Sequence, residues 1–169
     1  LYFNTRVRDG WHDMAGLSAV ATPPEFRRRG HIRTLLEESL AEYRDRDVFL
    51  SALWAFSDPF YAKYGWATSN RYAHQTGPPS ALSFSREYAA GSFVQPDVES
   101  DWERLNEVLL SHGADYQLTV DRTREWWEKR VFHGWQQEPY VYAWKFDGSI
   151  EGYLVYVIED TESDGSQIQ

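Results

Sequence analysis

The sequence has 169 residues, of which 42% are hydrophobic and 17% aromatic, which is enough for a packed core. Its formal net charge is −9 at pH 7, so a general nucleic-acid binder is not expected. Cysteine is absent, which excludes disulfides, thiol nucleophiles and thiolate metal ligands. We expect a cytoplasmic protein with no membrane partner, because no stretch approaches about 20 apolar residues and no signal-peptide pattern is found.

The first half predicts the order strand, strand, helix, strand, short helix, strand. Strands over 1–7 and 14–21 flank Asp9-Gly10, a dipeptide typical of hairpin turns. The apolar run 48–56 predicts a strand buried on both faces of a sheet and parallel to the strand before the helix. The helix begins near Gly30, since apolar residues then recur at helical spacing. They are Ile32, Leu35, Leu36, Leu40 and Tyr43.

A helix of about two turns is predicted after this run. Asp58 is a suitable cap, Pro59 suits the first helical position and Gly65 suits the stop. A returning strand is predicted over 71–75. The Pro- and Gly-rich segment that follows marks a boundary.

The second half begins with a strand over 86–94. A helix is predicted over 100–112, with Ser100 and Glu103 as a capping box and Trp102, Leu105, Val108 and Leu109 as its buried stripe. A further helix is predicted over about 121–131.

A second hairpin is predicted around Asp147-Gly148, with strands over 140–146 and 150–158. From Glu159 the chain becomes acidic and Ser-rich, which is typical of a frayed tail. The predicted organisation is therefore a first domain over 1–77, a linker over 78–85, a second domain over 86–160 and an acidic tail over 161–169.

The segment 20–33 predicts an anion-binding turn. Small apolar residues lead to Pro23-Pro24, then to three arginines, then to Gly30 at the start of a helix. Free N–H groups and the positive end of the helix dipole would point at a bound anion there. Three arginines in a row can also be a solvated basic turn, but the strand–loop–helix setting favours phosphate binding.

The same segment resembles the acetyl-CoA motif of the GNAT N-acetyltransferases, written R/Q-x-x-G-x-G/A. Arg27 and Gly30 match it, whereas Ile32 stands where the general family has Gly or Ala. With Arg33 and the downstream run Phe-Tyr-Ala-Lys-Tyr-Gly-Trp over 60–66, the pattern is closer to the Eis-type (enhanced intracellular survival) branch. That branch reads RRRGLLR and then IYGRFGYG.

The resemblance implies an α/β (α+β) fold, namely a GNAT-like mixed, mostly antiparallel sheet with flanking helices. It implies acetyl-CoA as cosubstrate, with the edge at 20–22 pairing with the pantetheine amides and the amides of 28–33 holding the pyrophosphate. The implied cofactor-binding residues are Val20, Ala21, Thr22, Arg27, Arg28, Arg29, Gly30, His31, Ile32, Arg33 and Ser57.

Tyr61 is the candidate catalytic residue, because in the resembling branch this tyrosine protonates the departing thiolate of CoA. A phenol is a proton donor at neutral pH, and a short helix after a strand would fix its direction. The alternative is a packing tyrosine with a satisfied hydroxyl. We expect Tyr64, which stands at the position of the family's Phe, to belong to the core.

The same branch uses its own C-terminal carboxylate as the base, and the end of this sequence does not resemble that terminus, so no base is carried over. The sequence matches the second half of one GNAT domain followed by the first half of a second. We therefore expect a fragment, or the ordered part of a longer protein, that is inactive alone if the base lies elsewhere.

The second half contains no catalytic motif. Four tryptophans, Trp126, Trp127, Trp135 and Trp144, suit either an amine pocket or a core. The five histidines lack ligand spacing, so no metal site is predicted. They are His12, His31, His74, His112 and His133.

The leading prediction is an N-acetyltransferase that moves an acetyl group from acetyl-CoA to a primary amine by direct attack in a ternary complex. The amine would be a small molecule or a peptide, of aminosugar, polyamine or lysine type, and the family's assemblies suggest a homo-oligomer. The alternative is a GNAT-fold module that binds CoA or acts as a scaffold without chemistry.

Overall fold

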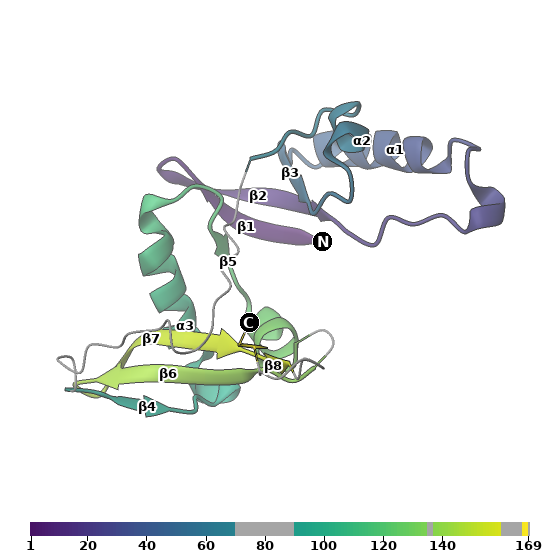
Figure 1. Ribbon diagram of the computed structural model, residues 1–169. Helices are drawn as coiled ribbons and strands as arrows, with labels where there is room; N and C mark the ends of the chain where they lie inside the picture. Colours follow the sequence, from purple (N-terminus) through teal and green to yellow (C-terminus); the bar gives the residue numbers. More distant parts are fainter. Residues whose placement is uncertain (70–89, 135–136, 160–166, 169) are drawn as a thin grey trace. The chain divides into compact units, whose positions relative to one another are not determined.

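The computed structural model describes residues 1–69, 90–134, 137–159 and 167–168. These residues form two compact units (Figure 1). The first unit contains residues 1–69 together with Gln117–Asp121, and the second contains the other described residues. Each unit has a sheet of its own.

The sheet of the first unit has the strand order β3-β2-β1-β5. β1 (Tyr2–Val7) and β2 (Gly10–Leu17) pair antiparallel, which confirms the predicted hairpin, although its turn is Arg8-Asp9. β2 ends at Leu17 and not near residue 21. Ala19 has a φ of 56°, a left-handed conformation that turns the chain out of the sheet.

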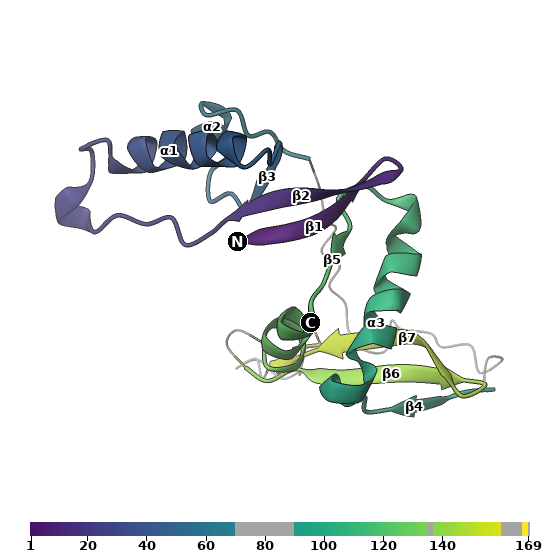
Figure 2. The same ribbon diagram turned by 180° about the vertical axis from the view of Figure 1, so that it is seen from behind.

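Helix α1 (His31–Asp45) connects β2 to β3 (Leu50–Leu53), and the two strands pair parallel as predicted. Figures 1 and 2 show α1 and the short helix α2 (Asp58–Ala62) on the same side of these strands. The prediction that the apolar run 48–56 is buried on both faces is wrong. β3 is the outermost strand of the sheet that the described residues form, and Trp54 just after it is 82% exposed.

A strand from later in the chain completes this sheet. β5 (Val120–Asp121) pairs antiparallel with β1. Arg6 N–H donates to the Thr119 carbonyl at 2.9 Å and Leu118 N–H donates to the Arg6 carbonyl at 2.8 Å. The buried Thr5 hydroxyl donates to the same Thr119 carbonyl at 3.1 Å. The sequence did not predict this strand, because two residues show no hydrophobic period.

The second unit has a three-stranded antiparallel sheet with the order β4-β6-β7. Its strands are β4 (Ser92–Val94), β6 (Tyr140–Phe146) and β7 (Ser149–Tyr156). The predicted Asp147-Gly148 turn is confirmed, with φ of 46° and 81° at its two residues. A short pair, β8 (Ile158–Glu159) with β9 (Gln167–Ile168), was not predicted.

The helices of the second unit are α3 (Val98–His112), a 3₁₀ turn (Gly113–Asp115), α4 (Arg124–Trp126) and a π-helical turn (Trp127–Phe132). The predicted stripe of α3 lies in or against the core. The predicted Ser100–Glu103 capping box is wrong, because the helix begins earlier. The cap is Asp97, whose carboxylate accepts the Glu99 and Ser100 N–H groups at 2.8 and 3.2 Å.

The core of the second unit gathers around Trp127, which is fully buried. Its indole N–H donates to Asn106 Oδ1 at 3.2 Å, and its ring meets Tyr153 edge-on at 5.4 Å between centroids. The buried members of this cluster are Leu105, Trp127, Val131, Ala143 and Ile150. Of the four tryptophans that suited an amine pocket or a core, Trp127 belongs to the core.

Some predictions fall outside the described residues. These are the strand over 71–75, the linker over 78–85, most of the tail over 161–169, Trp135 and His74. None of the helices in the described ranges has the length and hydropathy needed to cross a bilayer.

Candidate functional site

The start of α1 carries backbone N–H groups without acceptors. The cap residue Gly30 has a φ of 85°, its carbonyl accepts the first intrahelical bond from Thr34 N–H at 3.0 Å, and no side chain caps the helix. In the described part of the chain, none of the amides of residues 28–33 has a hydrogen-bond acceptor. The first turn contains no acidic residue. Amides left in this way form an anion-binding end of a helix.

The loop before the helix adds a second set of amides in a concave arrangement. Arg28 has a φ of 62°, so the chain twice adopts the left-handed conformation, at Arg28 and at Gly30. Alternation of this kind directs successive N–H groups toward one point. Gly30 is needed for its conformation and not for space, because a Cβ built there would meet nothing within 4 Å.

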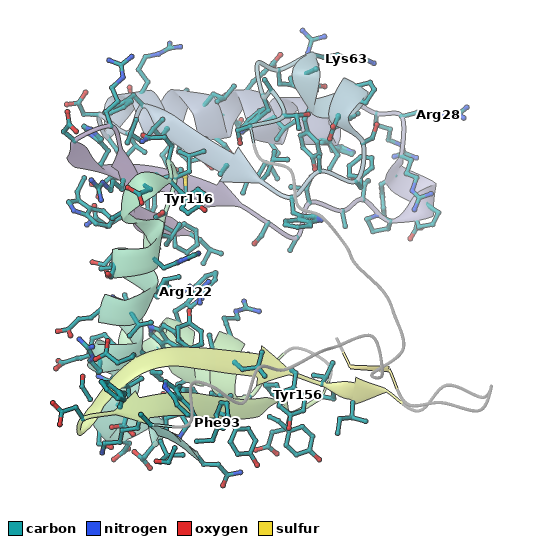
Figure 3. The ribbon with its side chains drawn as sticks, turned by 60° about the vertical axis from the view of Figure 1, so that its left-hand side comes forward. Arg28, Lys63, Phe93, Tyr116, Arg122 and Tyr156 are labelled. Atoms are coloured by element: carbon teal, nitrogen blue, oxygen red, sulfur yellow. The ribbon has the colours of Figure 1, made fainter. Side chains whose placement is uncertain are left out.

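The arginine side chains of the loop have different partners. Arg27 Nε donates to the Thr22 carbonyl at 3.2 Å, which ties the turn to the segment that leaves β2. The guanidinium of Arg29 lies 5.4 Å from the Phe26 ring centroid, in cation–π range. Arg33 pairs with Glu37 at 2.8 Å, and this hydrogen bond raises the pKa of its guanidinium. Arg28 extends away from the ribbon (Figure 3).

These groups line a cavity of about 610 Å³, the basic cavity, which contains ten of the eleven predicted cofactor-binding residues. They are Val20, Ala21, Thr22, Arg27, Arg28, Arg29, Gly30, His31, Ile32 and Arg33. The eleventh, Ser57, is the N-cap residue of α2, and its carbonyl accepts the N–H of Phe60 at 3.1 Å. The ten predicted residues that line the cavity therefore come from one continuous segment, residues 20–33.

The basic cavity is also lined by four aromatic residues that the sequence analysis did not assign to it. They are Phe26, Phe56, Phe60 and Tyr64. Phe56 is 72% exposed and Tyr64 is half-buried, although both were expected in the interior. The spacing of these residues in the sequence does not show whether they line a cavity or belong to the core. The exposure of an apolar run at the end of an edge strand is a property of the assembled sheet.

Tyr61 lines a different cavity. This second cavity, the acidic cavity, has a volume of about 670 Å³ and lies within the first unit. Asp58 is its one acidic lining residue, and no lysine, arginine or histidine of the described chain lines it. The basic cavity, in contrast, is lined by four arginines and His31 and by no described carboxylate. The two cavities thus have opposite charge.

The short helix α2 forms part of the wall between the cavities. Phe60 lines the basic cavity and its neighbour Tyr61 lines the acidic one, and their rings meet edge-on at 5.2 Å between centroids. Tyr61 is 4% exposed and also contacts Phe56 at 5.4 Å and Trp66 at 6.2 Å. No described group hydrogen-bonds its hydroxyl. The ring is therefore fixed by aromatic contacts, which leave the hydroxyl free to donate a proton.

In the described ranges, three or more His, Asp or Glu side chains do not come together as a metal site would require. His12 packs edge-on against Phe49 at 5.0 Å, and His133 Nδ1 lies 2.6 Å from the Glu128 carbonyl. Each of these two histidines therefore contacts a neighbouring protein group and not a cluster of metal-ligating side chains.

Residues 1–69 match the family model described as the acetyltransferase (GNAT) domain. Two curated proteins of Streptomyces griseus, named "Uncharacterized N-acetyltransferase" and "Uncharacterized N-acetyltransferase ORF5", are each 26% identical to the chain over 172 residues. The alignment covers 89% of this chain but 39% of each relative. The chain thus spans about two fifths of the length of these relatives.

Solved structures share the fold. A probable N-acyltransferase from Enterococcus faecalis V583 is 23% identical, with a TM-score of 0.72 over 94% of this chain and 40% of that one. A GCN5-related N-acetyltransferase from Anabaena variabilis ATCC 29413 is 20% identical, with a TM-score of 0.76 over 98% and 42%. The predicted mixed α/β, GNAT-like fold, with antiparallel sheets flanked by helices, is confirmed. The comparisons support a GNAT acetyltransferase domain in residues 1–69.

Proposed function

We propose that this protein is an acetyl-CoA-dependent N-acetyltransferase that resembles the Eis-type branch and acetylates a primary amine of aminosugar, polyamine or lysine type. The observation that carries the proposal is the row of amides at 28–33 without acceptors, placed in a cavity with four arginines. A diphosphate offers the charge and the acceptor oxygens that such a row requires. The residues present therefore fit the pyrophosphate of CoA.

The strands beside the cavity supply the second part of the fit. β2 and β3 pair in parallel as far as Leu17 and Leu53, and beyond them the chain at 18–23 leaves the sheet. Backbone groups of Val20, Ala21 and Thr22 line the basic cavity without being part of a strand. The Thr22 carbonyl accepts the Arg27 Nε bond, whereas the backbone groups of Val20 and Ala21 are available to pair with the amides of a pantetheine arm, as a strand edge pairs with an added peptide.

Acetyl-CoA supplies an activated thioester, so that attack by a neutral amine forms the C–N bond of the amide while the C–S bond breaks. Tyr61 is the proposed general acid, because its hydroxyl can give a proton to the departing sulfur from the wall between the cavities. The attacking nitrogen loses one proton to water or to a base, and a proton from solvent returns to the Tyr61 oxygen. We assign no base among the described residues.

The same proposal gives roles to the two units. The first unit, corresponding to the domain expected over 1–77, binds the cosubstrate, and the second, corresponding to 86–160, is the beginning of another GNAT-like domain. We further propose that the protein acts in the cytoplasm as a homo-oligomer. Sedimentation at several protein concentrations tests the assembly, since a monomer at every concentration would contradict it.

The experiment that tests the activity measures release of the CoA thiol when the protein is mixed with acetyl-CoA and a primary amine. Amine-dependent thiol release supports the enzyme, and Tyr61→Phe should lower its rate by about 100-fold or more with unchanged acetyl-CoA affinity. Binding of acetyl-CoA without turnover would instead support a non-catalytic CoA-binding module. An unchanged rate in Tyr61→Phe would contradict the role of Tyr61.

A further inference from the structure

Two cavities of opposite charge lie on the two sides of one short segment of the first unit. Along this segment, Phe56, Phe60 and Tyr64 line the basic cavity, whereas Trp54, Ala55, Asp58 and Tyr61 line the acidic one. The basic cavity suits the anionic cosubstrate. The acidic cavity is lined by Tyr61 and by none of the predicted cofactor-binding residues.

The acidic cavity combines a carboxylate with two indole rings. Asp58 is exposed, and its Oδ2 accepts a hydrogen bond from the Thr68 hydroxyl at 2.8 Å, which fixes the carboxylate while leaving its other oxygen without a described partner. Trp54 and Trp66 line the same cavity. The rest of its lining is apolar apart from Tyr61, Thr68 and Ser69. A carboxylate and aromatic rings that line one cavity are the groups that bind an organic cation.

We propose that the acidic cavity binds the acyl acceptor and selects amines that carry a second positive charge, with Asp58 as the residue that recognises this charge. The inference rests on the proposed function. The amine that reacts must be neutral, so it cannot itself pair with Asp58 while it attacks. A second, remote ammonium group can pair with the carboxylate and lie against the indole rings, while the neutral amine faces the carbonyl carbon beside Tyr61.

This arrangement explains the separation of the charges. An acceptor cation in the basic cavity would meet four arginines and be repelled, and a diphosphate in the acidic cavity would meet Asp58. Each ligand is therefore directed to its own side of α2. Reaction then takes place at the wall, where Phe60 and Tyr61 are in contact.

The test compares two acceptors of equal length, 1,5-diaminopentane and n-pentylamine, by kcat/KM for thiol release. Asp58→Asn removes the charge but keeps an oxygen that can accept the Thr68 hydrogen bond. We expect the preference for the diamine to fall by about fivefold, the upper range for one exposed ion pair. The readout is the ratio of the two kcat/KM values, so an effect of the substitution that is common to both acceptors cancels. Comparing the same two probes in both proteins cancels the statistical advantage of two amino groups.

Glu38→Gln is the matched control, since Glu38 is an exposed carboxylate on α1 that lines neither cavity. It should keep the preference of the unmodified protein. Acetyl-CoA affinity, measured by calorimetry without an acceptor, should be the same in all three proteins. If acetyl-CoA binds and both amines react, but Asp58→Asn keeps the full preference for the diamine, the inference is overturned and the proposed function stands. If acetyl-CoA does not bind the unmodified protein, both are overturned.

Discussion

A negative charge placed at the start of α1 should stabilise the protein and weaken cosubstrate binding at the same time. The first turn of this helix has no acidic residue, and its amides have no described acceptor. His31, the first residue of α1, is exposed and lines the basic cavity. Glutamate at position 31 interacts favourably with the helix dipole, which adds about 0.3–1 kcal/mol to the free energy of unfolding.

The same carboxylate lies beside the proposed diphosphate. One charge pair at a separation of about 6 Å in water costs about 0.7 kcal/mol, so repulsion from two phosphate charges costs about 1.4 kcal/mol. This raises the dissociation constant of acetyl-CoA about tenfold. The predicted changes in stability and in affinity therefore have opposite signs, which a general disturbance of the fold would not produce.

Urea unfolding measures the first effect and calorimetric titration with acetyl-CoA the second. Ala41→Glu is the control, because it adds the same charge at an exposed position on the same helix, far along the chain from the cavity. It should leave the affinity unchanged. Equal acetyl-CoA affinity in His31→Glu and Ala41→Glu would refute the assignment of these amides to an anion.

Three further predictions concern the framework that holds the site. Asn106→Leu leaves the buried Trp127 indole N–H and the Arg122 N–H without their acceptor, so urea unfolding should show a loss of about 1–3 kcal/mol, and equal stability would contradict it. Leu118→Pro removes the N–H that bonds Arg6 and cannot adopt the φ of 64°, so the first unit should lose more than about 2 kcal/mol, whereas Leu118→Gly, which keeps both, should not. The hydrogen bond from Lys129 lowers the pKa of Glu125. The stability that this pair adds is therefore present above the ordinary carboxylate pKa and is lost as the pH falls through the lowered pKa. Urea unfolding at several pH values should show that Glu125→Gln removes this part of the acid-dependent loss of stability, and an unchanged pH dependence would contradict it.

The sequence predicted the local features that depend on turn and helix chemistry. The Asp147-Gly148 hairpin, the glycine at the start of α1 and the parallel β2–β3 pair each follow from residues that are adjacent or linked by one helix. For the same reason, ten of the eleven residues predicted to bind the cosubstrate line one cavity, since they come from one continuous segment. In this segment the same residues determine both the backbone conformation and the groups that line the cavity.

Features that depend on distant segments were not predicted. The pairing of β5 with β1 joins residues more than 110 positions apart, and a strand of two residues leaves no pattern in the sequence. The edge position of β3 decides whether Phe56 is a core or a cavity residue, and it follows from the order of the whole sheet. The acidic cavity was missed because Asp58 served as a helix cap in the sequence prediction, whereas in the structure Ser57 occupies that position.

The most direct test of the account is an amide-resolved NMR titration of the protein with CoA. The account predicts that the largest shifts fall on the backbone N–H groups of residues 28–33 and saturate together, because these amides change from solvent to phosphate oxygens as acceptors. Saturable binding of CoA in which these amides keep their positions, or no binding at all, would contradict the claim that the turn before α1 holds a diphosphate.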